Sequence, residues 1–194
     1  MSKFDAIRQE IIAHEDNQTF TGRGIEPLFQ ASENARIAIV GQAPGRKAEE
    51  SGMVWNDLSG DRLREWMRLS REVFYESDRI AHIPMDFYYP GKGKSGDLPP
   101  RKGFAEAWHP QLLEAMPELE TLILIGNYAQ RYYLGGRREK NLTDTVRNFQ
   151  HYLPDYFPLV HPSPLNVGWF QRNPWFNRDV IPVLRDMVQK SLNR

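Results

Sequence analysis

Short apolar runs that favour β-strands alternate along the chain with stretches of helical periodicity, and this alternation constrains the fold more than any other feature. Four runs predict strands, at residues 36–40, 78–83, 121–125 and 157–161. Between them, apolar side chains recur every three to four residues, as they do in amphipathic helices. Strands that are separated by helices form parallel sheets covered on both faces. We therefore expect an α/β fold, a three-layer α/β/α sandwich around a central, mainly parallel four-stranded sheet.

Helical periodicity also predicts the helices that cover this sheet. They are expected at residues 2–13, 60–68, 104–116, 127–134 and 143–152, with a final helix that runs to Val188. The final helix has the clearest signals, because Asn173 can cap it and Pro174 suits its first turn. No repeat, low-complexity tract or linker interrupts the 194 residues, a length that is typical of one domain. We expect a single domain over residues 1–194.

Composition excludes several classes of protein. The chain has no cysteine, which rules out disulfides, thiolate nucleophiles and cysteine-bound zinc or iron–sulfur clusters. Lys plus Arg and Asp plus Glu total 25 each, so the net charge does not favour strong nonspecific binding of nucleic acid, although a local basic face is compatible with it. The apolar runs are far shorter than the ~20 residues that span a bilayer, and the first residues lack the apolar stretch of a secretion signal. We expect a cytoplasmic monomer with no membrane partner.

Two polar loops follow predicted strands. The first is Gly41-Gln42-Ala43-Pro44-Gly45, and the second is His161-Pro162-Ser163-Pro164-Leu165-Asn166. Ligand crevices of parallel sheets lie beyond the carboxyl ends of the strands, so both loops are candidate binding elements. Each also has an ordinary structural interpretation, as a tight connecting turn in the first case and a proline-stiffened turn with a satisfied histidine in the second.

A third candidate element lies just ahead of the helix predicted at 60–68. Its sequence is Trp55-Asn56-Asp57-Leu58-Ser59-Gly60-Asp61. Asp57 or Ser59 can serve as the N-cap of that helix. Asp57 can equally belong to a catalytic loop that a helix follows, and the residues alone leave both interpretations open.

The segment between residues 89 and 102 is basic. Its first seven residues end in Gly93-Lys94-Ser95, the tripeptide that also ends a phosphate-binding P-loop. A P-loop needs a glycine five residues before Gly93, where this chain has Tyr88. We therefore expect a flexible basic loop and not a nucleotide site. Its cations are candidates for contact with a DNA backbone or for simple solvation, and they are Lys92, Lys94, Arg101 and Lys102.

In order and spacing, these elements resemble the uracil-DNA glycosylase superfamily. The loop at 41–45 is similar to its Gly-x-x-Pro-Gly first motif, and the loop at 161–166 is similar to its His-Pro-Ser motif after the last strand. The resemblance covers roughly residues 36–188. It implies a DNA base-excision repair glycosylase, a hydrolase that cleaves the N-glycosidic bond of uracil or another deaminated base flipped out of DNA. The implied partner is DNA that contains such a base.

Gln42, Ala43 and Asp57 indicate which branch of the superfamily the chain resembles most. The loop at 41–45 resembles the first motif of the iron–sulfur thermostable branches, but the cysteines that bind their cluster are absent, so we expect no cofactor and no metal. One of those branches carries a carboxylate at the position of Gln42, and other branches carry Asp or Asn at the position of Ala43. A further branch with alanine at the third position has a pattern similar to Asp57-Leu58-Ser59-Gly60-x-x-Leu63, and this resemblance implies Asp57 as the catalytic carboxylate.

The resemblance also implies roles around that carboxylate. Asp57 would stabilise the sugar cation and orient water, while His161 would donate to the departing base. Within the base-binding loop at 41–45, the backbone amides of Gln42 and Ala43 would hold the base or the water, with the Gln42 side chain able to position water but not to act as a base. Trp55 is the nearest aromatic that can stack on the base, although relatives usually have Phe at the position of Val54. His82 or Asp86 would replace the Asn with which many relatives recognise uracil, and the alternative for each is a structural role.

DNA contacts are expected beside the pocket. Ser163 would contact a flanking phosphate, and Pro164-Leu165-Asn166 would act as a wedge in the gap left by the flipped base. The alternative is a member of the same fold that binds nucleic acid or free base without catalysis, which the neutral Gln42, Ala43 and the zero net charge favour. An unrelated enzyme on a similar scaffold is a further alternative.

Overall fold

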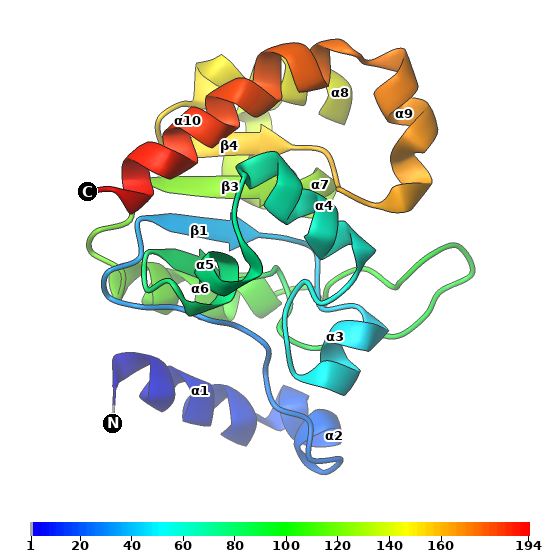
Figure 1. Ribbon diagram of the computed structural model, residues 1–194. Coiled ribbons are helices and arrows are strands. Elements are labelled where there is room, and N and C mark those ends of the chain that lie inside the picture. Colours follow the sequence, from blue (N-terminus) through cyan, green and yellow to red (C-terminus); the bar gives the residue numbers. More distant parts are fainter. Residues whose placement is uncertain (1) are drawn as a thin grey trace.

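The computed structural model describes residues 2–194 and contains one four-stranded sheet (Figure 1). All three strand pairs are parallel, in the order β2-β1-β3-β4. The strands are β1 (Ile37–Val40), β2 (Ile80–His82), β3 (Thr121–Ile125) and β4 (Tyr156–Leu159). The sequence prediction of a three-layer sandwich around a parallel four-stranded sheet is confirmed.

Alternate side chains of each strand enter two separate hydrophobic cores. Ala38 and Val40 of β1 pack in one core, and Ile37 and Ile39 pack in the other. The first core is covered by α1 (Lys3–Ala13), α6 (Phe104–Glu114) and α7 (Gly126–Leu134). The second is covered by α4 (Leu58–Met67), α5 (Arg71–Glu76), α8 (Leu142–Arg147) and α10 (Ile181–Leu192). Because both faces of the sheet are buried, its strands are almost continuously apolar.

Several short elements were not expected from the sequence. They are α2 (Gln18–Thr21), α3 (Arg46–Ser51), α5, α9 (Val167–Arg172) and the 3₁₀ turns η1 (Glu15–Asn17), η2 (Gly135–Arg137) and η4 (Pro164–Asn166). The helix predicted at 143–152 is divided into α8 and a 3₁₀ turn, η3 (Phe149–Tyr152). No helix among residues 2–194 is long and apolar enough to cross a membrane.

The final helix begins differently from the prediction. A π-helical turn, η5 (Phe176–Val180), precedes α10. Asn173 does not cap the helix through its side chain, because its Oδ1 accepts a hydrogen bond from the Trp175 indole at 3.0 Å and its Nδ2 donates to the Trp169 carbonyl at 2.8 Å. The amide of Asn173 therefore joins two tryptophans instead of satisfying a free backbone N–H.

Strand order creates a crevice at the carboxyl edge of the sheet. After β1 the chain continues to β2 on one side, whereas after β3 it continues to β4 on the other. The loops that follow β1 and β3 therefore diverge, as they do at the switch point of open α/β sheets. The strand arrows in Figure 1 point toward the side where α3, the start of α4 and α9 gather.

Two histidines are buried in the structural layers. His82 is fully buried, and its Nε2–H donates to the Phe74 carbonyl at 2.9 Å. His109 donates from Nε2 to the Pro84 carbonyl at 2.9 Å and accepts from the Tyr133 hydroxyl at 2.6 Å. Burial lowers the pKa of each imidazole to about 4. The expectation that His82 recognises the base is wrong, because its ring faces the α5 side of the sheet and lies outside the carboxyl-edge crevice.

Acid should therefore destabilise the fold through these histidines. Between pH 6.5 and about 4 the unfolded chain binds protons at His82 and His109 that the folded chain does not. The free energy of unfolding should fall as the pH is lowered through this window, by up to about 1.4 kcal/mol per pH unit for each histidine. Urea unfolding at several pH values should show this slope reduced in His109→Gln. The same replacement at the exposed His151 is the control, and an equal slope in both variants would contradict the assignment.

Candidate active site

A pocket of about 470 Å³ opens at the carboxyl edge of the sheet, within the roughly 300–1,000 Å³ typical of small-ligand sites. All five residues of the loop after β1 line it. The other lining residues are Ala48, Val54, Trp55, Asp57, Ser59, Pro84, Ser95, Gly96, Asp97, His161, Ser163 and Leu165. The structure thus brings together the three sequence elements that were singled out separately.

Asp57 caps α4 and lines the pocket at the same time. Its Oδ1 accepts a hydrogen bond from the Gly60 amide at 2.9 Å, so the carboxylate satisfies one free N–H of the helix. Its Oδ2 has no hydrogen-bond partner among residues 2–194. The capping and catalytic interpretations of Asp57 are therefore compatible, because each uses a different oxygen.

Trp55 is held against the pocket by two glycines. A Cβ on Gly60 would lie 1.7 Å from the Trp55 carbonyl oxygen, and a Cβ on Gly41 would lie 2.7 Å from the Trp55 indole. The backbone of Trp55 has a φ of 56°, a conformation that residues with a side chain rarely adopt. Its ring centroid lies 5.9 Å from that of His161. The indole therefore forms one wall of the pocket between the loop after β1 and the loop after β4.

A polar network supports the Trp55 segment from behind. The Tyr75 hydroxyl donates to the Trp55 carbonyl at 3.1 Å and accepts from the Arg64 guanidinium at 3.1 Å. Arg71 donates to the Asn56 side-chain oxygen at 3.0 Å. Sequence reasoning missed these three supporting residues. The sequence feature that could have identified them is Arg64, a charged residue among the apolar positions on the buried side of a predicted helix.

His161 presents one defined donor to the pocket. The Ser163 amide donates to its Nδ1 at 3.2 Å, so the neutral imidazole carries its proton on Nε2. Burial lowers the pKa of His161 below its ordinary value, and the negative charges of Asp57 and Asp97 partly oppose this shift. The ring is therefore neutral at neutral pH. Its Nε2–H has no partner among residues 2–194 and is available to a ligand.

The loop that carries His161 is fixed by side chains. Arg62 of α4 donates to the Ser163 carbonyl at 3.0 Å, and Asn166 donates to the His161 carbonyl at 2.8 Å. The Ser163 hydroxyl accepts from the Leu165 amide at 3.2 Å. Leu165, at the tip, is 92% exposed. Asn166 thus fastens the loop internally, and Leu165 is the apolar side chain that projects from it.

A family model described as the Uracil DNA glycosylase superfamily matches residues 28–185. The chain belongs to this superfamily. It is also similar to the solution NMR structure of a protein from Methanosarcina acetivorans that is provisionally described as a uracil DNA glycosylase. The two sequences are 15% identical, the match covers 82% of this chain and 94% of the other, and the TM-score is 0.49. The resemblance inferred from the motifs is confirmed by the family match.

Gln42 has a different environment from the one expected for this superfamily position. Its Nε2 donates to the Leu98 carbonyl at 3.0 Å and so ties the loop at 91–98 to the first motif. This amide nitrogen is therefore bonded to Leu98 and does not serve to position a water. The Gly41 and Gln42 carbonyls accept from the Met85 and Asp86 amides at 2.9 and 3.2 Å, which fixes the backbone of the motif.

Arg101 is a structural residue, and its assignment to DNA is wrong. Its Nε and Nη2 donate to the two oxygens of the fully buried Asp86 at 2.8 and 2.9 Å. A third bond joins its Nη1 to the Asn17 side-chain oxygen at 2.8 Å. This ion pair also removes Asp86 as a residue that could recognise the base, because both carboxylate oxygens are occupied.

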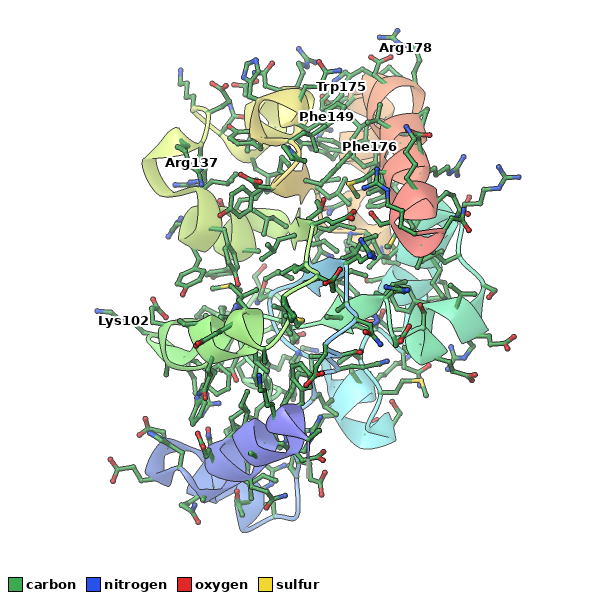
Figure 2. All side chains as sticks on the ribbon, turned by 90° about the vertical axis from the view of Figure 1, so that its left-hand side faces the viewer. Lys102, Arg137, Phe149, Trp175, Phe176 and Arg178 are labelled. Carbon is green, nitrogen blue, oxygen red and sulfur yellow. The ribbon has the colours of Figure 1, made fainter. Side chains whose placement is uncertain are left out.

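The three lysines of the basic segment differ in position. Lys92 and Lys94 are exposed on the loop at 91–98, whose residues 95–97 line the pocket. Lys102 is exposed just ahead of α6 and projects outward at the edge of the molecule in Figure 2. Only Lys92 and Lys94 therefore lie on a segment that borders the pocket.

Asp97 is a pocket residue that sequence reasoning missed. It lines the pocket, and its Oδ1 accepts a hydrogen bond from the Tyr89 hydroxyl at 3.3 Å. The available signal was an acidic side chain in an otherwise basic loop rich in glycine and proline.

The contact between Gly60 and Trp55 predicts a specific cost of adding one methyl group. Gly60→Ala should lower the free energy of unfolding by about 2–3 kcal/mol, because the added Cβ cannot fit beside a backbone carbonyl without moving it. Gly136→Ala is the matched control, since nothing lies within 4 Å of a Cβ there. Urea unfolding of both variants measures the difference. Equal stability of the two would contradict the close approach.

Proposed function

We propose that the protein is a monofunctional DNA glycosylase that hydrolyses the N-glycosidic bond of uracil or another deaminated base flipped out of DNA. The observation that carries the proposal is that the Asp57 carboxylate and the neutral His161 imidazole line one pocket, each with a free polar atom. Membership of the uracil DNA glycosylase superfamily supports a reaction of this type. The reaction needs no group beyond the side chains of the pocket and water.

The chemistry divides between these two side chains. Cleavage of the bond develops positive charge on the sugar and negative charge on the departing base. The free Oδ2 of Asp57 stabilises the sugar cation and orients the attacking water, and the Nε2–H of His161 donates to a carbonyl oxygen of the base. A neutral imidazole suits this task, because it donates one directed hydrogen bond without needing a buried positive charge.

Extrusion of the base needs compensation of a few kcal/mol. In this proposal the Trp55 indole stacks on the flipped base, a contact worth about 1–3 kcal/mol. Leu165 fills the gap left in the duplex, which its 92% exposure favours. The Ser163 hydroxyl keeps its hydrogen free for a flanking phosphate, since its oxygen accepts from the Leu165 amide.

Loss of the Asp57 charge should abolish most base release without disturbing the fold. Asp57→Asn keeps an oxygen that can cap α4 and removes the carboxylate, so release should fall by at least about 100-fold. Single-turnover cleavage of a duplex with uracil opposite guanine, and of one with hypoxanthine, followed by alkali, measures this. Asp155→Asn, an exposed acid before β4, is the control.

The same assay separates the two functions that the sequence left open. Scission by the wild type that is lost in Asp57→Asn supports the glycosylase. No scission on either base, with DNA binding retained, would instead identify a binding member of the superfamily without catalysis.

Binding of DNA should depend on the loop lysines through salt. If Lys92 and Lys94 each neutralise one phosphate, replacing both with alanine should reduce the slope of log affinity against log salt by about 1.8. Fluorescence anisotropy with a labelled duplex at several salt concentrations measures the slope. Lys190→Ala, on α10, is the control. An unchanged slope in the double variant would remove these lysines from the DNA interface.

A further inference from the structure

Asp97 places a second carboxylate at the pocket, on the loop at 91–98, which several hydrogen bonds hold in place. The loop closes through hydrogen bonds between Gly93 and Gly96 and between Leu98 and Gly91, each of 2.8 Å. The bond from Gln42 ties it to the first motif. Within residues 2–194, Asp97 forms no ion pair with any Lys, Arg or His. The carboxylate is therefore held in place but is not neutralised.

One oxygen of Asp97 is free and directed toward the first motif. Oδ1 accepts from Tyr89, whereas Oδ2 lies 3.9 Å from the point that a Cβ on Gly45 would occupy. Because Gly45 has no side chain, it places no atom between Oδ2 of Asp97 and the backbone of the loop at 41–45. A ligand that binds against the first motif would thus lie next to the free Oδ2 of Asp97.

Several other acceptors around the pocket already accept a hydrogen bond. The backbone carbonyls that accept hydrogen bonds from other parts of the chain are those of Gly41, Gln42, His161, Pro162 and Ser163. Oδ1 of Asp57 accepts from Gly60. Two charged acceptors remain, Oδ2 of Asp57 and Oδ2 of Asp97. Since the proposed reaction uses the first at the sugar, the second is left for the base.

Deamination changes a base in a way that such an acceptor can detect. When cytosine becomes uracil, its ring N3 changes from an acceptor to an N–H donor, and its exocyclic amine becomes a carbonyl. Adenine undergoes the same two changes, at N1 and C6, when it becomes hypoxanthine. A carboxylate that faces the ring nitrogen bonds the deaminated base and repels the lone pair of the normal one.

We propose that Asp97 determines base specificity by accepting a hydrogen bond from the ring N–H that deamination creates, while His161 donates to the carbonyl beside it. The inference rests on the proposed glycosylase function and names its substrate class, bases with an adjacent ring N–H and carbonyl. Asp97 is a specificity residue for this class. Its loss leaves Asp57 and His161 in place.

The test compares bases that differ in that one hydrogen. Duplexes carry uracil or N3-methyluracil, and a second pair carries hypoxanthine or N1-methylhypoxanthine. Single-turnover release is measured for the wild type, for Asp97→Leu, which keeps bulk without an acceptor, and for the Asp155→Asn control. We expect the rate on the better of the two unmethylated bases to fall by about 10- to 100-fold in Asp97→Leu, with the rate on its methylated partner nearly unchanged.

A binding measurement makes the result independent of catalysis. In the Asp57→Asn background, fluorescence anisotropy should show a preference for the unmethylated base that Asp97→Leu abolishes. If the wild type releases no base but this preference is present and depends on Asp97, the proposed function fails and the specificity role stands. Equal effects of Asp97→Leu on both members of a pair would overturn the role. So would a wild-type preference for cytosine or adenine, because the carboxylate would then face an exocyclic amine.

Discussion

The close approach of Trp55 to two glycines is the constraint on which the site depends. Gly60 lets the start of α4 lie against the Trp55 carbonyl, and Gly41 lets the loop after β1 lie under the indole. The positive φ of Trp55 carries a cost of about 1–2 kcal/mol, which the hydrogen bond from Tyr75 and the packing of the ring offset. Without this contact, neither Asp57 at the start of α4 nor the first motif would have a fixed position relative to His161.

Charge is distributed unevenly in a chain whose net charge is zero. Three arginines around the site are used internally: Arg62 fixes the loop at 161–166, Arg64 supports Tyr75, and Arg101 neutralises buried Asp86. The pocket itself combines two carboxylates with a neutral imidazole. Such a site selects a ligand by its donors and acceptors, and in the proposed function the exposed lysines on the bordering loop attract the DNA backbone.

The fold and much of the pocket could be predicted from the sequence because they follow from local periodicity. Strands at 36–40 and 121–125 and the polar loops after β1 and β4 depend on apolar runs and on where they end. His82 was misassigned although alternation gave the answer: it shares the face of Ile80, which is buried against α5. Arg101 and Asp97 could not be placed, because their partners Asp86 and Tyr89 are set by the path of a loop and no sequence period describes that path.

The neutral Gln42 links the first motif to the loop that carries Asp97. Its position in the motif carries an acid in one of the thermostable branches that the chain resembles, and here the amide instead holds the Leu98 carbonyl. Leu98 directly follows Asp97, so the bond made by Gln42 fixes the segment that brings a carboxylate to the pocket. A neighbouring loop thus brings a carboxylate to a pocket whose first motif carries none. In the proposed function, Asp57 therefore acts at the bond that breaks and Asp97 at the base that leaves.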